Sequence, residues 1–81
     1  TSADVLSQLE TSDKNGDSRA VKDLAHKLKG SAGSLGLTAL MNTCQVIEIA
    51  PEPLEAYAKT SDSLKRQVNE SVIALDELMV D

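Results

Sequence analysis

Residues 18–36, which read SRAVKDLAHKLKGSAGSLG, decide the fold. Within them, apolar residues recur at helical spacing, at Val21, Leu24, Ala25, Leu28, Ala32 and Leu35. This spacing matches the 3.6-residue period of an α-helix that buries one face. Asp17 or Ser18 can cap the start of the helix, and Gly36 stands where a tight turn is expected at its end. The stretch therefore predicts an amphipathic helix followed by a turn.

The rest of the chain shows the helical period in three further segments, and no segment alternates as a strand does. A short first helix precedes the turn at 14–17, with apolar residues Val5, Leu6 and Leu9. A third helix, which Pro51 and Pro53 end, has apolar residues Leu37, Leu40, Met41, Cys44 and Ile47. The last stripe comprises Leu54, Tyr57, Ser61, Leu64, Val68, Leu75 and Leu78. We expect one long helix over 54–80, or two if the polar run at 60–63 breaks it.

The composition favours one small domain of helices packed on helices. The chain has 81 residues, of which 41% are hydrophobic, and Tyr57 is its one aromatic residue. A core of Leu, Val, Ile, Ala and Met suits a helical bundle better than a β-sandwich, which relies on aromatic and β-branched residues. We expect an all-α fold, a small antiparallel up-down four-helix bundle with a short first helix, formed by residues 1–81 as a single domain.

Charge and residue counts exclude several classes of function. The net charge of −5 argues against nucleic acid as a partner. No apolar run approaches the roughly 20 residues of a membrane span, so we expect no membrane contact by this domain. One cysteine and one histidine are too few for a zinc site, and we expect no metal and no cofactor. Cys44, on the apolar face of the third helix, is expected to be a buried thiol rather than a reactive one.

His26, the only histidine, stands on the exposed side of the predicted helix. At about 100° per residue, it lies roughly 140° from the centre of the apolar stripe. Lys22 and Lys29 are one turn to either side of it, and Gly30 and Gly33 follow one and two turns later. Glycine within a helix costs up to about 1 kcal/mol relative to alanine. Two glycines beside one histidine therefore indicate that another macromolecule approaches the backbone closely.

Positive charge is concentrated around this histidine. From Arg19 to Lys29 the chain has four basic residues against Asp23 alone, the other two being Lys22 and Lys27. A basic face on an acidic protein suits a negatively charged partner or group. A free imidazole is mostly neutral at pH 7 and can act as a nucleophile. Capture of a phosphoryl group, with a lysine as the neutralising cation, fits a convex helix face better than general-base catalysis, which needs an orienting carboxylate and a pocket.

Residues 26–32, HKLKGSA, with Gly36 ten residues after the histidine, resemble the signature of histidine-containing phosphotransfer (HPt) domains. That signature reads His, any residue, Leu, Lys, Gly, Ser and a small residue, with a later Gly. The likeness extends into the third helix, where the family's Leu-x3-Cys-x2-hydrophobic-Glu spacing is matched by Leu40, Cys44, Ile47 and Glu48. It covers residues 18–50, and the flanking helices agree only in general character.

The resemblance implies a four-helix bundle whose histidine accepts a phosphoryl group from a receiver-domain aspartate and transfers it to another receiver-domain aspartate in a two-component pathway. It implies His26 as the phosphorylated residue, Lys29 as the charge-stabilising residue and Gly36 as the turn between the central helices. It implies no kinase activity of the domain itself, and response-regulator receiver domains as partners. We further predict that partner docking involves Lys22, Asp23, Lys27, Gly30 and Gly33. Of these, Lys27 departs from the family, which often has a small hydroxyl residue there.

One alternative stays open, a non-catalytic helical adaptor that docks an acidic partner through the basic face around His26. An autonomous enzyme is disfavoured, because the sequence supplies no second catalytic group at usable spacing. Glu48 is either a solvated charge or the partner of a lysine across the bundle. We expect a cytoplasmic monomer, either free-standing or the C-terminal domain of a membrane-bound hybrid sensor kinase.

Overall fold

The structure is a computed structural model that describes residues 2–78. These residues form five helices, α1 (Ser2–Lys14), α2 (Ser18–Ser34), α3 (Thr38–Ile49), α4 (Pro53–Glu70) and α5 (Val72–Leu78). No strand occurs within this range, as the all-α prediction requires. The single domain predicted for residues 1–81 extends past it, since residues 1 and 79–81 lie outside the described part of the chain.

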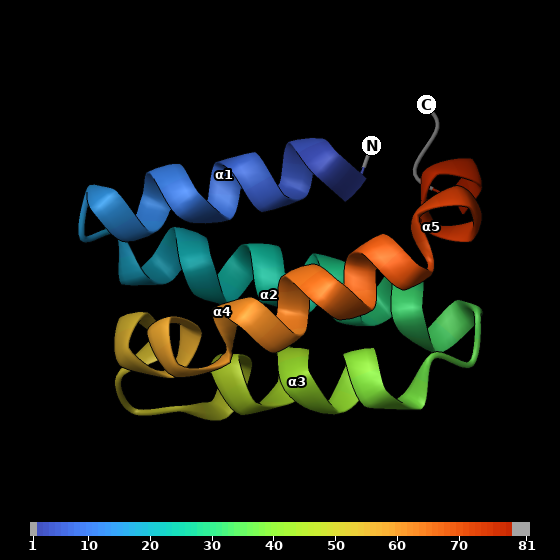
Figure 1. Cartoon of the computed structure of the whole chain (residues 1–81). Coiled ribbons are helices and arrows are strands. Elements are labelled where there is room, and N and C mark those ends of the chain that lie inside the picture. The colour runs from blue at the N-terminus through green and yellow to red at the C-terminus, as the bar shows by residue number, and fades with distance from the viewer. Residues whose placement is uncertain (1, 79–81) are drawn as a thin grey trace.

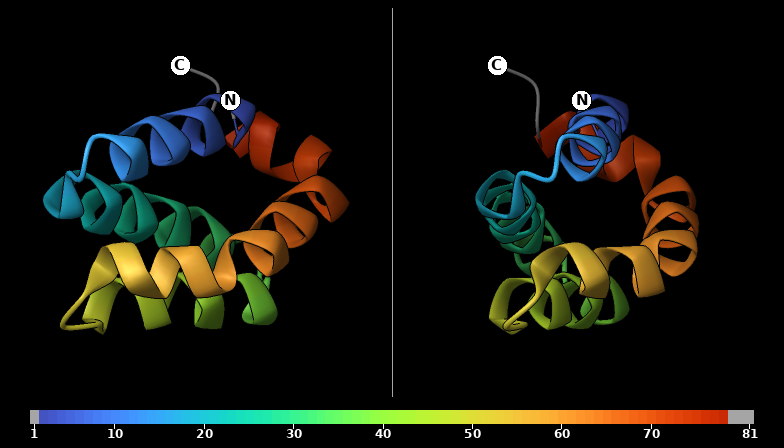
Figure 2. Two further views of the ribbon diagram at one scale, coloured as in Figure 1. Left: turned by 60° about the vertical axis from the view of Figure 1, so that its left-hand side comes forward. Right: turned by 90° about the vertical axis from the view of Figure 1, so that its left-hand side faces the viewer.

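Helices α1 to α4 form an antiparallel up-down bundle, in which each helix runs back alongside an earlier one (Figure 1). α2 contacts α1, α3 and α4, and α4 also contacts α3 and α1. α5 turns away from the end of α4 and lies against α1, as the two views of Figure 2 show. With 13 residues, α1 is shorter than α2 (17) and α4 (18) but not shorter than α3, which has 12, so the first helix is not distinctly short. The predicted four-helix bundle is confirmed, with a short fifth helix added to it.

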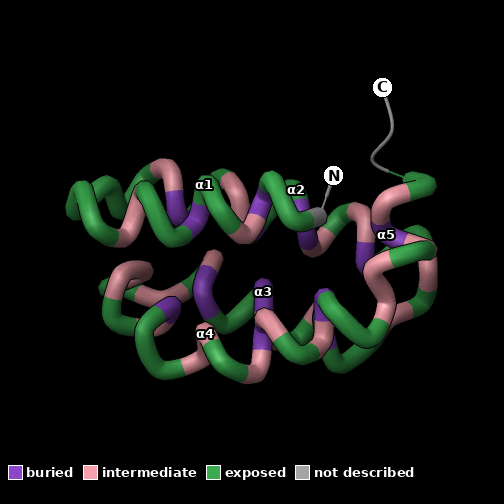
Figure 3. The backbone as a smooth tube through the Cα atoms, turned by 45° about the horizontal axis from the view of Figure 1, so that its top comes forward, coloured by how far each residue is buried: buried purple, intermediate pink, exposed green. Residues whose placement is uncertain are grey.

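The core lies where the apolar stripes of the helices meet, and the buried positions face the inside of the bundle (Figure 3). Its buried residues are Val5, Leu9, Val21, Ala25, Leu28, Ala32, Leu40, Cys44, Ile47, Tyr57, Leu64, Val68 and Leu75. An ion pair of 2.5 Å between Glu10 Oε1 and Lys65 Nζ also joins α1 to α4. The apolar stripes predicted for the first three helices therefore supply the core, although five of their members are only partly buried against it: Leu6, Leu24, Leu35, Leu37 and Met41.

The start and end of α2 follow from local chemistry. Asp17 is the N-cap, and its Oδ1 accepts a hydrogen bond from the backbone N–H of Ala20 at 3.1 Å. This bond satisfies one of the N–H groups that lack a partner in the first turn of a helix. After the helix, Gly36 has φ of +70°, which glycine adopts without steric cost. The N–H of Leu37 then bonds to the carbonyl of Ala32 at 2.9 Å, and α3 runs back beside α2.

The segment after Pro53 forms two helices rather than the one long helix that we expected. The break lies at Ser71, and the polar run at 60–63, where a break was considered, lies inside α4. The Thr60 hydroxyl donates to the carbonyl of Ala56 at 2.8 Å, so this side chain is satisfied within the helix and does not end it.

The position of the break reflects the length of the bundle. A helix of 18 residues such as α4 is about 27 Å long, close to the length of α2, so a straight continuation would extend past its partners. The turn at Ser71 instead directs α5 across the end of the bundle, where Leu75 is fully buried. Leu78 was predicted to continue the buried stripe, and this prediction was wrong, because the residue is 46% exposed at the end of α5.

Candidate functional site

The central pair of helices, α2 and α3, brings His26 and Glu48 together. The two residues are 22 positions apart, one on each side of the turn at Gly36. Because α2 and α3 are antiparallel and packed along their length, a residue near the middle of α2 lies beside one near the end of α3. The tight turn therefore sets which α3 side chain reaches the histidine.

Glu48 contacts both His26 and Lys29. Its Oε2 interacts with His26 Nδ1, and its Oε1 accepts a hydrogen bond from Lys29 Nζ at 2.5 Å. The His26 side chain is 71% exposed, whereas those of Lys29 and Glu48 are 29% and 15% exposed. The imidazole thus stands in solvent with one ring nitrogen held by a carboxylate. The carboxylate and the lysine form a more protected layer beneath the ring.

The charges in this cluster favour an ionised Glu48. The hydrogen bond from Lys29 lowers the pKa of Glu48 below its ordinary value, and contact with His26 acts in the same direction, while burial opposes both. An ionised carboxylate beside Nδ1 favours a proton on that nitrogen and leaves Nε2 with its lone pair. In a neutral imidazole with this tautomer, Nε2 is the nitrogen with the free lone pair, on a ring that is 71% exposed.

Cys44 lies one turn before Glu48 on α3 and is fully buried. Burial and, to a smaller extent, the Glu48 charge raise the pKa of its thiol to about 12, while the charge of Lys29 acts in the opposite direction. A thiolate is the nucleophilic form of cysteine, so a thiol with this pKa is inert near neutral pH. Cys44 therefore belongs to the core beneath the site, as predicted.

The other predicted docking residues surround the cluster of His26, Lys29 and Glu48. Lys22, Asp23, Lys27, Gly30 and Gly33 are all exposed. Lys27 and Lys29 are two residues apart and so point about 160° away from each other on the helix. Because Lys29 turns toward α3, Lys27 lies on the opposite flank of His26 and does not join the cluster.

The two helical glycines do not serve packing inside the domain. A Cβ built at Gly30 has nothing within 4 Å, and one built at Gly33 meets only the side chain of Met41, at 3.7 and 3.8 Å. An alanine side chain at Gly30 would meet no atom, and the Met41 distances at Gly33 are those of ordinary van der Waals contact. The space in front of Gly30 is therefore open, next to the exposed imidazole, whereas Gly33 borders the side chain of Met41.

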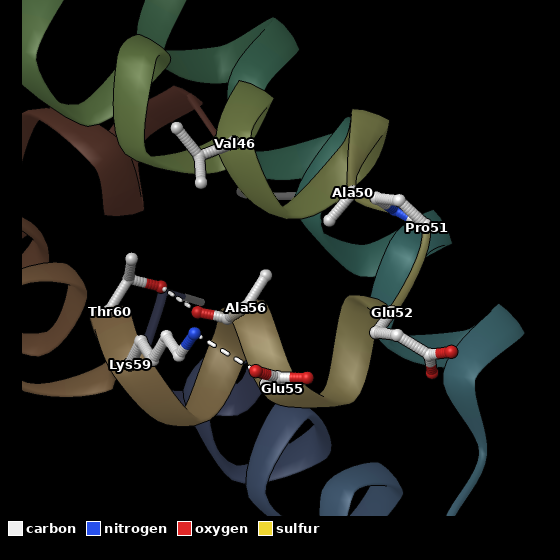
Figure 4. Close-up of a pocket in the computed structure, with 8 residues that line it drawn as sticks. All are labelled: Val46, Ala50, Pro51, Glu52, Glu55, Ala56, Lys59 and Thr60. Atoms are coloured by element: carbon white, nitrogen blue, oxygen red, sulfur yellow. Dashed lines mark hydrogen bonds and ion pairs between the residues drawn. The ribbon is translucent and has the colours of Figure 1, made fainter.

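One hollow lies between the end of α3 and the first half of α4 (Figure 4). It has a volume of about 410 Å³, and its lining includes Val46, Ala50 and Ala56, with a Lys59–Glu55 ion pair of 2.9 Å at its rim. None of the site residues predicted from the sequence lines it. It adds no polar group to the histidine cluster.

Within residues 2–78, no three His, Cys, Asp or Glu side chains are grouped so that they could hold a metal ion. Over the same range, none of the helices combines the length and the apolar character that crossing a membrane requires.

The fold and the site define a class, an antiparallel helical bundle that carries one exposed histidine on a central helix beside a basic residue. The family model of the Hpt domain matches residues 1–78, so the chain belongs to the Hpt domain family. Members of this family are phosphotransfer modules rather than kinases. They act through histidine in two-component phosphorelays and interact with response-regulator receiver domains. Neither the comparison with curated proteins nor that with solved structures gave a match.

Glu48 is the residue whose role the sequence reasoning missed. The resemblance included it as part of a spacing, and its contact with a lysine was left open. Its contact with His26 was not anticipated, because it joins residues of two different helices that are 22 positions apart. A signal was present, since Glu48 and His26 stand at comparable distances on the two sides of the predicted turn at Gly36.

Proposed function

We propose that His26 is the phosphorylated residue of this domain, and that it accepts a phosphoryl group from the aspartate of one receiver domain and passes it to the aspartate of another. One observation carries the proposal. His26 is the exposed histidine of a central helix, and its Nδ1 is engaged by Glu48, which leaves Nε2 for chemistry. A convex surface of this kind suits a group delivered and collected by another protein.

The chemical step is a displacement at phosphorus. The lone pair of Nε2 attacks the phosphorus of the receiver's acyl phosphate, an N–P bond forms, and the P–O bond to the aspartate breaks. The aspartate leaves as a carboxylate, and the ring, which keeps its Nδ1 proton, gains positive charge. Glu48 faces that proton and stabilises the charge as it develops. Transfer to the second receiver reverses these bond changes.

Lys29 supplies the second electrostatic contribution. Its ammonium group lies one turn from His26 and is held by Glu48 at 2.5 Å, so it is already positioned near the ring. A phosphoryl group on Nε2 brings negative charge that this cation stabilises. Glu48 thus acts as a positioning residue for both His26 and Lys29.

Transfer of radiolabelled phosphoryl from a phosphorylated receiver domain tests the proposal. The wild-type domain should acquire acid-labile label, and His26→Gln should acquire none. Lys59→Gln is the control, since it introduces the same side chain at a 72% exposed position on α4 that is not among the predicted site residues, and it should retain labelling. Acid-labile label on His26→Gln would contradict the assignment. Normal signalling by His26→Gln would instead favour the non-covalent adaptor.

The proposal also covers the location and oligomeric state of the domain and the protein to which it belongs. It would act without kinase activity of its own, as a cytoplasmic monomer, either free-standing or joined to a hybrid sensor kinase. The partner receivers that donate and accept would dock on the face formed by α2 and α3 around Gly30 and Gly33, where the backbone is open to approach.

A further inference from the structure

A second, charged hollow lies next to the histidine cluster. It has a volume of about 590 Å³ and lies between the first turns of α2 and the connection from α3 to α4. Its lining includes Arg19, Lys22, Asp23, Ala50, Pro51 and Pro53. Lys22 is one turn before His26 on α2, so the hollow adjoins the proposed phosphotransfer surface.

The two cations of this hollow are not neutralised inside the domain. In the part of the chain that the structure describes, neither Arg19 nor Lys22 forms an ion pair, whereas Lys29 is held by Glu48. Arg19 and Lys22 are both exposed. A guanidinium and an ammonium group one turn apart form a site for carboxylates, with which arginine makes two parallel hydrogen bonds. Asp23 offsets only part of this charge.

The opposite wall of the hollow is apolar and stiff. Ala50, Pro51 and Pro53 line it, and the proline rings fix φ along the connection. Ile49, the residue before Ala50, is 71% exposed and adds apolar surface at the end of α3. A partner that fits this hollow therefore presents acidic side chains beside apolar ones, the combination of polar rim and apolar centre that protein interfaces show.

We propose that this hollow docks an acidic segment of the receiver domain that exchanges its phosphoryl group with His26. The inference rests on the proposed function and adds to it a second contact point, with Arg19 and Lys22 as residues that select the receiver. The protein as a whole carries a net charge of −5, so an acidic partner is attracted to this face and repelled by the rest of the surface. That asymmetry would orient the receiver before transfer.

The test compares two double variants with the same change in charge. Arg19→Glu with Lys22→Glu reverses the charge of the hollow. Lys59→Glu with Arg66→Glu reverses two α4 side chains that are 72% and 71% exposed. Circular dichroism melting first establishes that both variants fold. The rate of phosphoryl transfer from an isolated receiver domain, phosphorylated with acetyl phosphate, is then measured against receiver concentration at low and high salt. Phosphoramidate, a small donor that needs no docking, reports the reactivity of the histidine alone.

The hollow variant should lose about tenfold or more in kcat/KM at low salt, mainly through KM. The loss should shrink at high salt, where charges are screened. Its reaction with phosphoramidate and the transfer rate of the α4 variant should stay near wild type. An equal loss of kcat/KM in both variants, or no loss in the variant of Arg19 and Lys22, would overturn the docking site. Either result would leave the assignment of His26 as the phosphorylated residue intact. Labelling of His26→Gln would instead overturn the proposed function.

Discussion

Gly30 offers a test in which stability and function should change in opposite directions. It lies inside α2, one turn after His26, and a Cβ at this position meets nothing within 4 Å. Glycine in a helix interior is about 0.8–1 kcal/mol less favourable than alanine, because it loses more backbone freedom on folding. Since no steric cost offsets this gain, Gly30→Ala should raise the free energy of unfolding by about 0.5–1 kcal/mol.

The size of the domain makes this change measurable. One kcal/mol shifts the Tm of a domain of 60–100 residues by roughly 4–8 °C, so Gly30→Ala should melt about 2–8 °C above wild type. Urea denaturation followed by circular dichroism gives the free energy directly. A lower Tm or a lower free energy of unfolding for Gly30→Ala would refute the reading of Gly30 as free of internal packing.

The functional half of the test uses a longer side chain. Gly30→Gln keeps good helix propensity but fills the open space beside His26. Transfer from a phosphorylated receiver should fall at least about tenfold in kcat/KM, equivalent to about 1.4 kcal/mol of lost docking. Phosphoramidate should still react normally. Ala58→Gln, which adds the same side chain to an exposed position on α4, serves as control. Unchanged transfer by Gly30→Gln would refute the clearance role.

Three further predictions follow from single residues. Because the pKa of Glu48 is lowered from 4.5, its stabilising effect is present above that pH and is lost as pH falls through the folded value. The difference in unfolding free energy between wild type and Glu48→Gln should therefore shrink in acid, and a constant difference in urea titrations would contradict this. Cys44, with a pKa of about 12, should react with a thiol reagent at pH 8 only as fast as the domain opens, and labelling should accelerate with urea. Gly36→Ala should destabilise by about 1–2 kcal/mol in the same assay, unlike Gly30→Ala, because φ is +70°.

The central helices could be predicted from sequence because their signals are local. The apolar stripe from Val21 to Ala32 has the period of one helix, and Asp17 and Gly36 mark its ends by cap and turn chemistry. The exposure of His26 followed from the same helical period, because a residue about 140° from the apolar stripe faces away from the core. None of these inferences needed a contact between distant parts of the chain.

The break at Ser71 could not be predicted in this way. Tyr57, Leu64, Val68 and Leu75 lie on one stripe of a straight helix, so the periodicity gives no reason to divide it. The reason is tertiary, because the bundle ends near Ser71 and Leu75 is buried only when α5 turns back over α1. The local polar run at 60–63 was the wrong place to expect a break, since Thr60 is satisfied by the helix itself.

The sequence by itself determined the all-α fold, the exposed position of His26 and the basic character of its surroundings, because helical period, turn residues and charge are properties of neighbouring residues. Only the tertiary structure decided the role of Glu48. Whether its carboxylate stays solvated or holds His26 and Lys29 depends on how α3 is placed against α2. That placement reflects the turn at Gly36 and the shared core, to which α2 contributes Leu28 and α3 contributes Cys44 and Ile47. A contact between residues 22 positions apart exists only once the two helices are packed together.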